Sequence, residues 1–338
     1  GHLDAIINMA GIFAMHAKMG ISSGTYLLTQ SRVVLKYFGL LFFPYSQNLD
    51  HDLPWSAGLF DGVTLPSLLV VILLIAAAFR SARRFPLISF GILWFFLTLS
   101  VSSSIIPQKD AVMEHRLYLP SVGFFIAFLA AAYGLIKHSR WFVVCAAGVV
   151  LSLSFLTYQR NALWTDEVKF WEDVVRKSPG KARPYTNLGL VYRKHGEYSK
   201  AIAAYEKALS LRPPSGEPLS RIYTNLGAVY GVMRRYPAEI ALYLKAIAAD
   251  PKNYQAYSNL GYAYALVGDY RNAVKYGEAA VKMAPRFDEA WNNLGVTHAR
   301  MEHYQEAVYA FQGALRINPY YKEAASNLSL AREKLGQS

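Results

Sequence analysis

Cysteine and the short motifs of common catalytic and metal sites are nearly absent from this sequence of 338 residues. The only cysteine, Cys145, lies inside an apolar run, which excludes a disulfide framework. No zinc-ligand spacing, phosphate-binding glycine loop or nucleophile elbow occurs, so none of those enzyme classes is indicated. A dense block of lysine and arginine is also missing. Because this block is missing, we expect no nucleic-acid partner. The formal charge of +12 favours contact with anionic lipid or phosphate groups.

The chain divides near residue 160 into two halves of different composition. Residues 1–160 contain 11 Lys and Arg, 6 Asp and Glu, and long apolar runs. Residues 161–338 contain 24 Lys and Arg and 17 Asp and Glu, with regular amphipathic patterning. This contrast predicts an all-α protein in which a polytopic helical membrane domain (1–160) precedes a soluble helical domain. The chain begins without methionine, and no basic segment precedes an apolar run there, so we expect no signal peptide.

Five apolar runs in the first half have the length needed to cross a bilayer, about 20 residues. They are residues 25–43, 62–79, 86–106, 117–136 and 140–158. The first run carries Arg32 and Lys36 near its middle, where charge is costly. These cations are expected to face phosphate or carboxylate groups, unless the helix lies in the membrane interface. The moderately apolar residues 3–19 favour an interfacial helix.

Short basic loops predict the orientation of the membrane domain. "RSARR" at 80–84 and "KHSR" at 137–140 lie on one side, which the positive-inside rule assigns to the cytoplasm. The opposite loops and the whole second half are then expected outside the cytoplasm.

The second half contains a repeat with a period of 34 residues. "NLG" begins at residues 187, 225, 259 and 293 and "NLS" at 327, with glycine, alanine and aromatic residues at fixed offsets and a proline at each repeat end. This tetratricopeptide pattern predicts an α-solenoid of four repeats, at residues 182–215, 220–253, 254–287 and 288–321. We expect a connector with a half-repeat at 161–181 and a capping helix at 322–338.

Two residues depart from the repeat pattern. Glu239 stands where the pattern has a small residue, and Gly277 stands where it has an aromatic residue. Since each change disturbs a position that helices use for mutual contact, looser packing is expected at both.

One asparagine recurs at the same place on the first helix of successive repeats. The five members are Asn187, Asn225, Asn259, Asn293 and Asn327. Along a superhelix they would form a ladder of amides in the concave groove, where each can donate to and accept from a peptide backbone. The pattern predicts a protein or peptide ligand; the alternative is that each amide satisfies a neighbouring helix.

The stretch "MEHRLYLPSVGF" at 113–124 places three charged or titratable residues before an apolar run. Glu114 and His115 are candidate catalytic residues that could deprotonate or orient an acceptor hydroxyl, and Arg116 could bind a lipid phosphate. The alternative, which the spacing alone favours, is a polar collar with Arg116 extended to the headgroups.

A second polar stretch, "QNLDHDLPWS" at 47–56, contains Asp50, His51 and Asp52. Two carboxylates beside a histidine are candidate ligands for a divalent metal or an acid/base pair. Ligands so close in sequence cannot complete a metal site alone, so a polar turn at the membrane surface is the alternative, and no other cofactor is indicated.

The order of these segments resembles a known family along nearly the whole chain. "YLLTQSRVVLKYFGLLFFPYSQNLDHD", "MEHRLYLPSVGF" and "YQRNALWTDEVKFWEDVVRKSP" are followed by the repeats. This arrangement is similar to the polytopic C-type glycosyltransferases with C-terminal tetratricopeptide repeats, namely the transmembrane-and-repeat O-mannosyltransferases and their bacterial relatives.

The resemblance implies transfer of a sugar from a polyprenyl-phosphate donor to a protein acceptor outside the cytoplasm, in a bacterial inner membrane. It assigns Arg116, Arg32 and Lys36 to the lipid phosphate, Glu114 and His115 to the same site, and the asparagine ladder to the acceptor polypeptide. Enzymes of this fold carry a catalytic carboxylate on their first extracytoplasmic loop, which is expected upstream of this sequence. A non-enzymatic membrane-anchored scaffold for envelope proteins is the alternative function.

Overall fold

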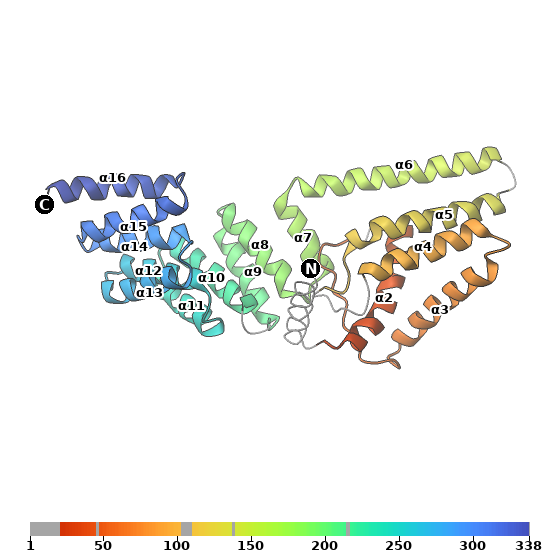
Figure 1. Ribbon diagram of the computed structural model, residues 1–338, viewed down its shortest axis with the longest axis horizontal. Helices are drawn as coiled ribbons and strands as arrows, with labels where there is room; N and C mark the ends of the chain where they lie inside the picture. The colour runs from red at the N-terminus through yellow and green to blue at the C-terminus, as the bar shows by residue number, and fades with distance from the viewer. Residues whose placement is uncertain (1–20, 45–46, 103–109, 137–138, 214–216, 338) are drawn as a thin grey trace, which may run out of the picture. The chain divides into compact units, whose positions relative to one another are not determined.

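The computed structural model describes residues 21–44, 47–102, 110–136, 139–213 and 217–337. These residues form α-helices and a 3₁₀ helix, and no strand occurs among them, so the predicted all-α class is confirmed. The predicted interfacial segment 3–19 lies outside the described residues. The chain divides into two compact units, residues 1–179 and 180–338, each with its own internal packing (Figure 1).

The first unit contains six α-helices and one 3₁₀ helix within its described residues. They are α2 (Ser23–Phe42), α3 (Thr64–Ser81), α4 (Pro86–Ser102), η2 (Glu114–Leu117), α5 (Tyr118–Leu135), α6 (Ser139–Trp164) and α7 (Glu167–Lys177). Three described segments are long and apolar enough to cross a membrane: α3, the continuous helical segment Glu114–Leu135, and Arg140–Trp164 of α6. Pro86–Ser100 of α4 is a shorter apolar segment, and α2 is long enough but less apolar.

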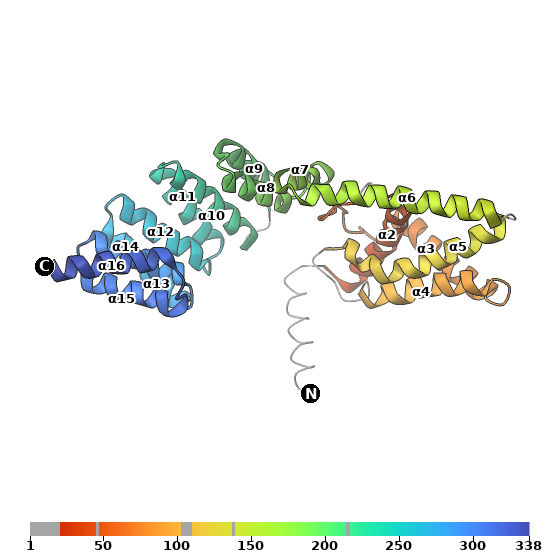
Figure 2. The ribbon, with the colours of Figure 1, turned by 90° about the horizontal axis from the view of Figure 1, so that it is seen from above.

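The core of the first unit lies where α2 packs on α4 and on the segment before α5. Val33, Tyr37 and Leu40 of α2 are buried together with Phe95 and Leu99 of α4. Helices α4 and α5 lie side by side in both views of this unit (Figures 1 and 2).

Two glycines permit the close approach of α4 and α5. A Cβ at Gly91 would collide with the carbonyl oxygen of Gly123, and a Cβ at Gly123 would collide with that of Gly91. Small residues at such contacts allow helix backbones to pack closely in membrane proteins.

Helix α7 is tied to the end of α6 by a buried carboxylate. Asp173 is 5% exposed and accepts from Arg160 at 2.8 Å, Lys177 at 2.7 Å and Arg176 at 2.5 Å. Burial alone would raise the pKa of Asp173, but the hydrogen bonds from these three cations hold it below the ordinary value. The basic residues after the last apolar run are therefore partly used in this contact.

The second unit consists of paired helices and a closing helix. The pairs are α8 (Ala182–Lys194) with α9 (Tyr198–Ser210), α10 (Glu217–Val232) with α11 (Tyr236–Ala249), α12 (Tyr254–Leu266) with α13 (Tyr270–Met283), and α14 (Asp288–Arg300) with α15 (Tyr304–Ile317). Helix α16 (Lys322–Gln337) packs on α15 (Figure 1). This stack of hairpins is the predicted solenoid.

Within a repeat, a glycine of the first helix lies against an aromatic ring of the second. A Cβ at Gly189 would lie 2.7 Å from the ring of Tyr205, and a Cβ at Gly295 would lie 2.6 Å from that of Phe311. Both rings are almost fully buried. The repeat pattern therefore encodes a ring-on-backbone contact that only glycine permits.

Looser packing at the two departures stays a prediction, but the structure shows how each residue is accommodated. In the third repeat Gly277 lets the two backbones meet, because a Cβ at Gly261 would lie only 2.9 Å from the Gly277 nitrogen. In the second repeat the added volume of Glu239 is accommodated by Gly231, since a Cβ at Gly231 would collide with the Glu239 carboxyl. Each departure is compensated by a second glycine nearby.

Candidate functional site

The carboxylate of Glu114 is held by the loop at residues 47–52. Its Oε1 accepts from the backbone N–H of Asn48 at 2.5 Å and lies 2.7 Å from Nε2 of His51, whose side chain is 3% exposed. His115, the next residue, is exposed. The structure thus brings Glu114 to His51, while the catalytic role of Glu114 and His115 stays a prediction.

Arg116 points back to α2 instead of pairing with an acid. Its Nη1 donates to the hydroxyl of Tyr26 at 3.3 Å, and its Nη2 lies 3.2 Å from the sulfur of Met113. Tyr37 fixes the same segment, because its hydroxyl accepts from the N–H and donates to the carbonyl of Met113, each at 3.0 Å. Within the described part of this unit no carboxylate pairs with Arg116, so its charge is available to an anion.

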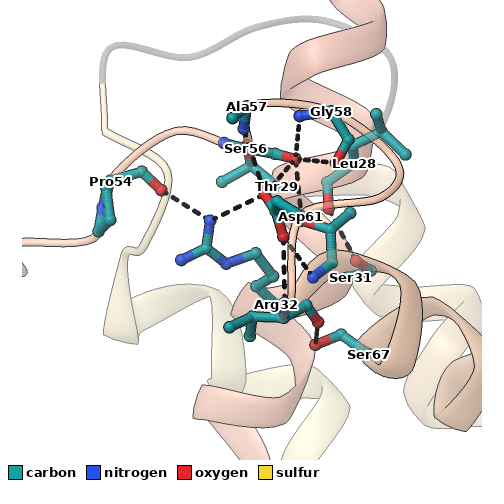
Figure 3. Close-up of polar contacts among 12 residues, drawn as sticks. Leu28, Thr29, Ser31, Arg32, Pro54, Ser56, Ala57, Gly58, Asp61 and Ser67 are labelled. Atoms are coloured by element: carbon teal, nitrogen blue, oxygen red, sulfur yellow. Dashed lines mark hydrogen bonds and ion pairs between the residues drawn. The ribbon is translucent and has the colours of Figure 1, made fainter.

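Arg32 has a carboxylate partner in the loop before α3. Figure 3 shows its Nη1 directed toward the carbonyl of Pro54, at 3.3 Å, and toward Oδ2 of Asp61, at 3.8 Å. Its Nε is buried without a partner. Lys36 is half-buried on the same helix and also has an interaction partner. This arrangement agrees with the expectation that a cation on this helix faces a carboxylate, and phosphate binding by Arg32 and Lys36 stays a prediction.

Asp61 organises the turn that leads into α3 (Figure 3). Its Oδ1 accepts from the backbone N–H of Thr64 at 2.6 Å and of Val63 at 3.2 Å, and its Oδ2 accepts from the hydroxyl of Ser56 at 3.0 Å. Hydrogen bonds, those from Thr64 first, hold the pKa of Asp61 well below its ordinary value. Asp61 is therefore a fixed anion beside Arg32. Asp61 is not among the predicted site residues, although an Asp immediately before the apolar run 62–79 is a helix N-cap signal.

The candidate metal ligands do not converge. Among the described residues, no group of three or more His, Cys, Asp or Glu side chains could hold a metal ion. His51 is engaged with Glu114, and Asp50 is buried with its backbone carbonyl accepting from Ser178 at 2.5 Å. Asp52, by contrast, is exposed.

The same loop also contacts the end of α7. The amide of Asn48 donates to the hydroxyl of Ser178 at 2.7 Å, and Lys177 donates to the carbonyl of Gln47 at 2.8 Å. These residues are separated by 130 positions, so no local pattern could have revealed the contact. The loop at 47–52 therefore joins η2 on one side to α7 on the other.

The asparagine ladder of the second unit divides into engaged and free amides. Asn293 donates to Ser258 at 3.0 Å and Asn327 donates to Asn292 at 3.1 Å, in each case to the first helix of the preceding repeat. These two contacts favour the structural alternative for the C-terminal part of the ladder.

Asn187 and Asn225 differ from the later members. Neither amide has a hydrogen-bond partner among the residues that the structure describes. Asn225 and Asn259 line a polar cavity of about 620 Å³ in the second and third repeats. A polypeptide could therefore reach unpaired amides in the N-terminal part of the groove.

Three family models match the repeat region of the chain. All three describe the tetratricopeptide repeat, and they cover residues 182–214, 242–275 and 267–322. The second unit therefore carries tetratricopeptide repeats, as predicted.

Curated relatives of the chain include O-mannosyl-transferases. The chain is 34% identical over 109 residues to the Protein O-mannosyl-transferase Tmtc2 of Drosophila melanogaster, covering 30% of this chain and 11% of that protein. It is 29% identical over 150 residues to the Protein O-mannosyl-transferase F38B6.6 of Caenorhabditis elegans, covering 44% and 21%. The matches thus span about a tenth to a fifth of these relatives. The predicted resemblance is confirmed as a similarity to part of such proteins.

Two solved structures are similar to part of the chain. "YrrB: a TPR protein with an unusual peptide-binding site" is 20% identical with a TM-score of 0.38, over 59% of this chain and 96% of that one. MamA is 23% identical with a TM-score of 0.40, over 48% of this chain and 93% of that one.

Proposed function

We propose that this chain is a membrane-anchored tetratricopeptide-repeat protein whose groove recruits an extended polypeptide for sugar transfer from a polyprenyl-phosphate donor. The proposal rests on two features of the described residues in a chain similar to part of the O-mannosyl-transferases. Arg116, beside an apolar helix, has no carboxylate partner among them, and two amides in the repeat groove have no hydrogen-bond partner among them.

The donor part of the proposal concerns Arg116. This guanidinium lies one residue before the apolar run of α5, is oriented by Tyr26, and has no carboxylate partner among the described residues. Arginine binds phosphate oxygens with two parallel hydrogen bonds, which suits the headgroup of a lipid phosphate at the start of a span. Arg32 and Lys36 are proposed as weaker contributors, since Arg32 is already shared with Asp61.

The acceptor part concerns the groove of the second unit. Free amides at Asn187 and Asn225 can pair with a polypeptide backbone irrespective of its sequence. Recruitment of many different polypeptides requires this kind of contact. The engaged members Asn293 and Asn327 are proposed to hold the wall of the groove in place and to offer their remaining oxygen atoms.

A non-enzymatic scaffold is the second candidate, and one contact favours it. The Glu114 carboxylate next to Arg116 already accepts from His51 and from the Asn48 N–H. A general base must be able to reach the proton that it abstracts. If the only role of Glu114 is to hold the loop at 47–52 in place, the described part of the unit would bind lipid without catalysing a reaction. The repeats would then bind the partner protein, which is the function of a scaffold.

Binding of polyprenyl phosphate to the full-length protein in detergent tests the first candidate. We expect saturable binding of the wild-type protein and an affinity reduced at least about tenfold in Arg116→Ala. Loss of two parallel hydrogen bonds to a phosphate reduces the binding free energy by about 1.4 kcal/mol or more, which is this factor of ten. Arg84→Ala is the matched control, since Arg84 is an exposed arginine in the loop between α3 and α4. Absence of binding in the folded wild-type protein would leave the scaffold as the function.

The location of the repeats outside the cytoplasm of a bacterial inner membrane is also a proposal, supported by the basic loops at 80–84 and 137–140. Cys145 can be replaced by serine, after which Glu333→Cys and Arg83→Cys provide single reporters at exposed positions. A membrane-impermeant maleimide on intact cells is expected to label the first and not the second. The reverse labelling would invert the orientation.

A further inference from the structure

Glu239 is a buried carboxyl that the solenoid does not need. It lies on α11 at the position where the other repeats have Ala201, Ala273 and Ala307, each fully buried. Glu239 is itself only 5% exposed, and its Oε2 has no hydrogen-bond partner within the described part of the chain. Burying an unpaired carboxyl costs free energy, so packing alone does not explain this residue.

The surrounding structure keeps room for the carboxyl. Gly231 lies opposite on α10, where any side chain would collide with the Glu239 oxygen atoms. The corresponding residues of the third and fourth repeats are Ala265 and Ala299. Where the third and fourth repeats have two alanines, the second repeat has a glutamate and a glycine. The Glu239 carboxyl lies at the wall of the cavity.

The Glu239 carboxyl lies beside other polar groups of the cavity wall. Tyr243 follows Glu239 by one helical turn on α11, and both residues line the cavity together with Asn259. The buried Oε2 atom has no hydrogen-bond partner among the described residues and can accept from another donor. A ligand that supplies a donor with a positive charge would satisfy both the hydrogen bond and the buried charge.

Other charged and titratable groups also face this cavity. They are Arg193 from α8, Arg234 from the turn before α11, Tyr236 and Tyr243 of α11, Tyr262 of α12, and Glu289 of α14. Neither arginine forms an ion pair with Glu239 among the described residues, and burial raises the pKa of Glu239 to about 7. The neighbouring cations therefore leave the carboxyl without a charge partner.

We propose that this cavity binds the side chain of a lysine or arginine from an extended polypeptide in the groove, with the Glu239 carboxylate as its partner. The free amide of Asn225, on the same cavity wall, holds the backbone beside the inserted side chain. A bare metal ion fits less well, since no group of three ligand side chains exists among the described residues. An anion would pair with Arg193 and Arg234 but would leave the Glu239 Oε2 atom without a donor. The inference rests on the proposed polypeptide groove and gives it a preference for basic residues.

Fluorescence anisotropy with two peptides on the full-length protein in detergent tests this preference. Both are end-blocked nonapeptides of alternating alanine and serine; the central residue is lysine in one and norleucine, the uncharged analogue of similar shape, in the other. At pH 8 we expect the lysine peptide to bind at least about tenfold more tightly. The preference should decrease as the pH falls below 7, because Glu239 must lose its proton to pair with the cation.

Glu239→Ala and Glu239→Gln should abolish the preference while leaving the binding of the norleucine peptide unchanged. The alanine variant is expected to fold, since alanine stands at this position in the other repeats. Glu206→Ala, which removes an exposed carboxylate from the preceding repeat, is the matched control and should keep the preference.

Equal affinity for the two peptides in the wild-type protein would overturn the cationic pocket and leave the polypeptide groove intact. A lysine preference that survives in both Glu239 variants would overturn it as well. Failure of both peptides to bind a folded protein would instead reject the groove itself, and with it this inference.

Discussion

His51 and Glu114 are 63 residues apart in the sequence, and Nε2 of the histidine lies 2.7 Å from Oε1 of the glutamate. The contact joins the loop at 47–52 to the 3₁₀ helix that begins the α5 segment. The same loop is bound to the end of α7 through Asn48 and Ser178. The loop at 47–52 is thus connected to η2 through His51 and to the end of α7 through Asn48.

Removal of the Glu114 side chain should destabilise the first unit. In Glu114→Ala the buried His51 nitrogen and the Asn48 N–H lose their acceptor, which is expected to cost about 1–3 kcal/mol. His115→Ala, at an exposed neighbouring position, should change stability by no more than about 0.5 kcal/mol. Thermal unfolding in detergent, followed by tryptophan fluorescence, compares the two. Equal shifts would mean that the His51 contact is not used for stability.

The repeat architecture could be predicted from the sequence because its contacts are local and periodic. The 34-residue spacing fixes which glycine faces which ring, as at Gly189 and Tyr205. The sequence showed that the amides of the ladder occupy equivalent positions, but it did not show which of them form hydrogen bonds. Whether Asn225 is free and Asn293 bound depends on the residue that each meets in the preceding repeat.

The polar contacts of the first unit could not be predicted in the same way. Glu114 with His51, and Arg32 with Asp61, join loops and helices that are far apart in sequence and carry no period. A cation in the middle of an apolar helix was expected to face an anionic group, and Arg32 does so. The sequence did not show that this group is Asp61. At Glu239 the sequence displayed both members of the compensating pair, yet only the fold brings Gly231 opposite the carboxyl.

Substitution of Gly227 should disrupt the second repeat. A Cβ at this position would lie 2.7 Å from Cε1 of Tyr243, which is buried in the centre of the hairpin. Gly227→Ala is therefore expected to cost about 1–3 kcal/mol through displacement of the ring. Gly336→Ala on α16 is the control, because no described atom outside its own helix backbone and chain neighbours lies within 4 Å of its Cβ position. Chemical denaturation of both variants checks the difference, and a neutral Gly227→Ala would show that the ring moves freely.

The turn between the two helices of each repeat contains a residue with positive φ. It is glycine at Gly268 (φ 83°) but glutamate at Glu302 (φ 63°). A non-glycine residue in this region is strained by about 1–2 kcal/mol. Glycine removes this strain, but it also increases the conformational entropy of the unfolded chain, which offsets part of the gain in stability. Glu302→Gly should therefore stabilise the protein by about 0.5 kcal/mol, and Gly268→Ala should destabilise it by about 1 kcal/mol or more. Denaturant midpoints measure both, and a destabilised Glu302→Gly would contradict the conformational argument.

The stability of the second unit should depend on pH through Glu239. Burial raises the pKa of this carboxyl to about 7, against an ordinary value of 4.5 in the unfolded chain. Between these values the folded state binds more protons than the unfolded state. The contribution of Glu239 to stability is therefore fully present below about pH 4.5 and is lost as the pH rises through 7.

The effect is at most about 3.4 kcal/mol and is best isolated as a difference between variants. Other groups titrate over the same range, so denaturant midpoints of the wild-type protein and Glu239→Gln are compared at pH 5 and pH 8. The glutamine has no proton to lose, and its stability should decline less between the two pH values than that of the wild-type protein. A parallel decline would mean that Glu239 is ionised, and therefore already paired, before any ligand enters the cavity. That outcome would also remove the reason for expecting a basic side chain there.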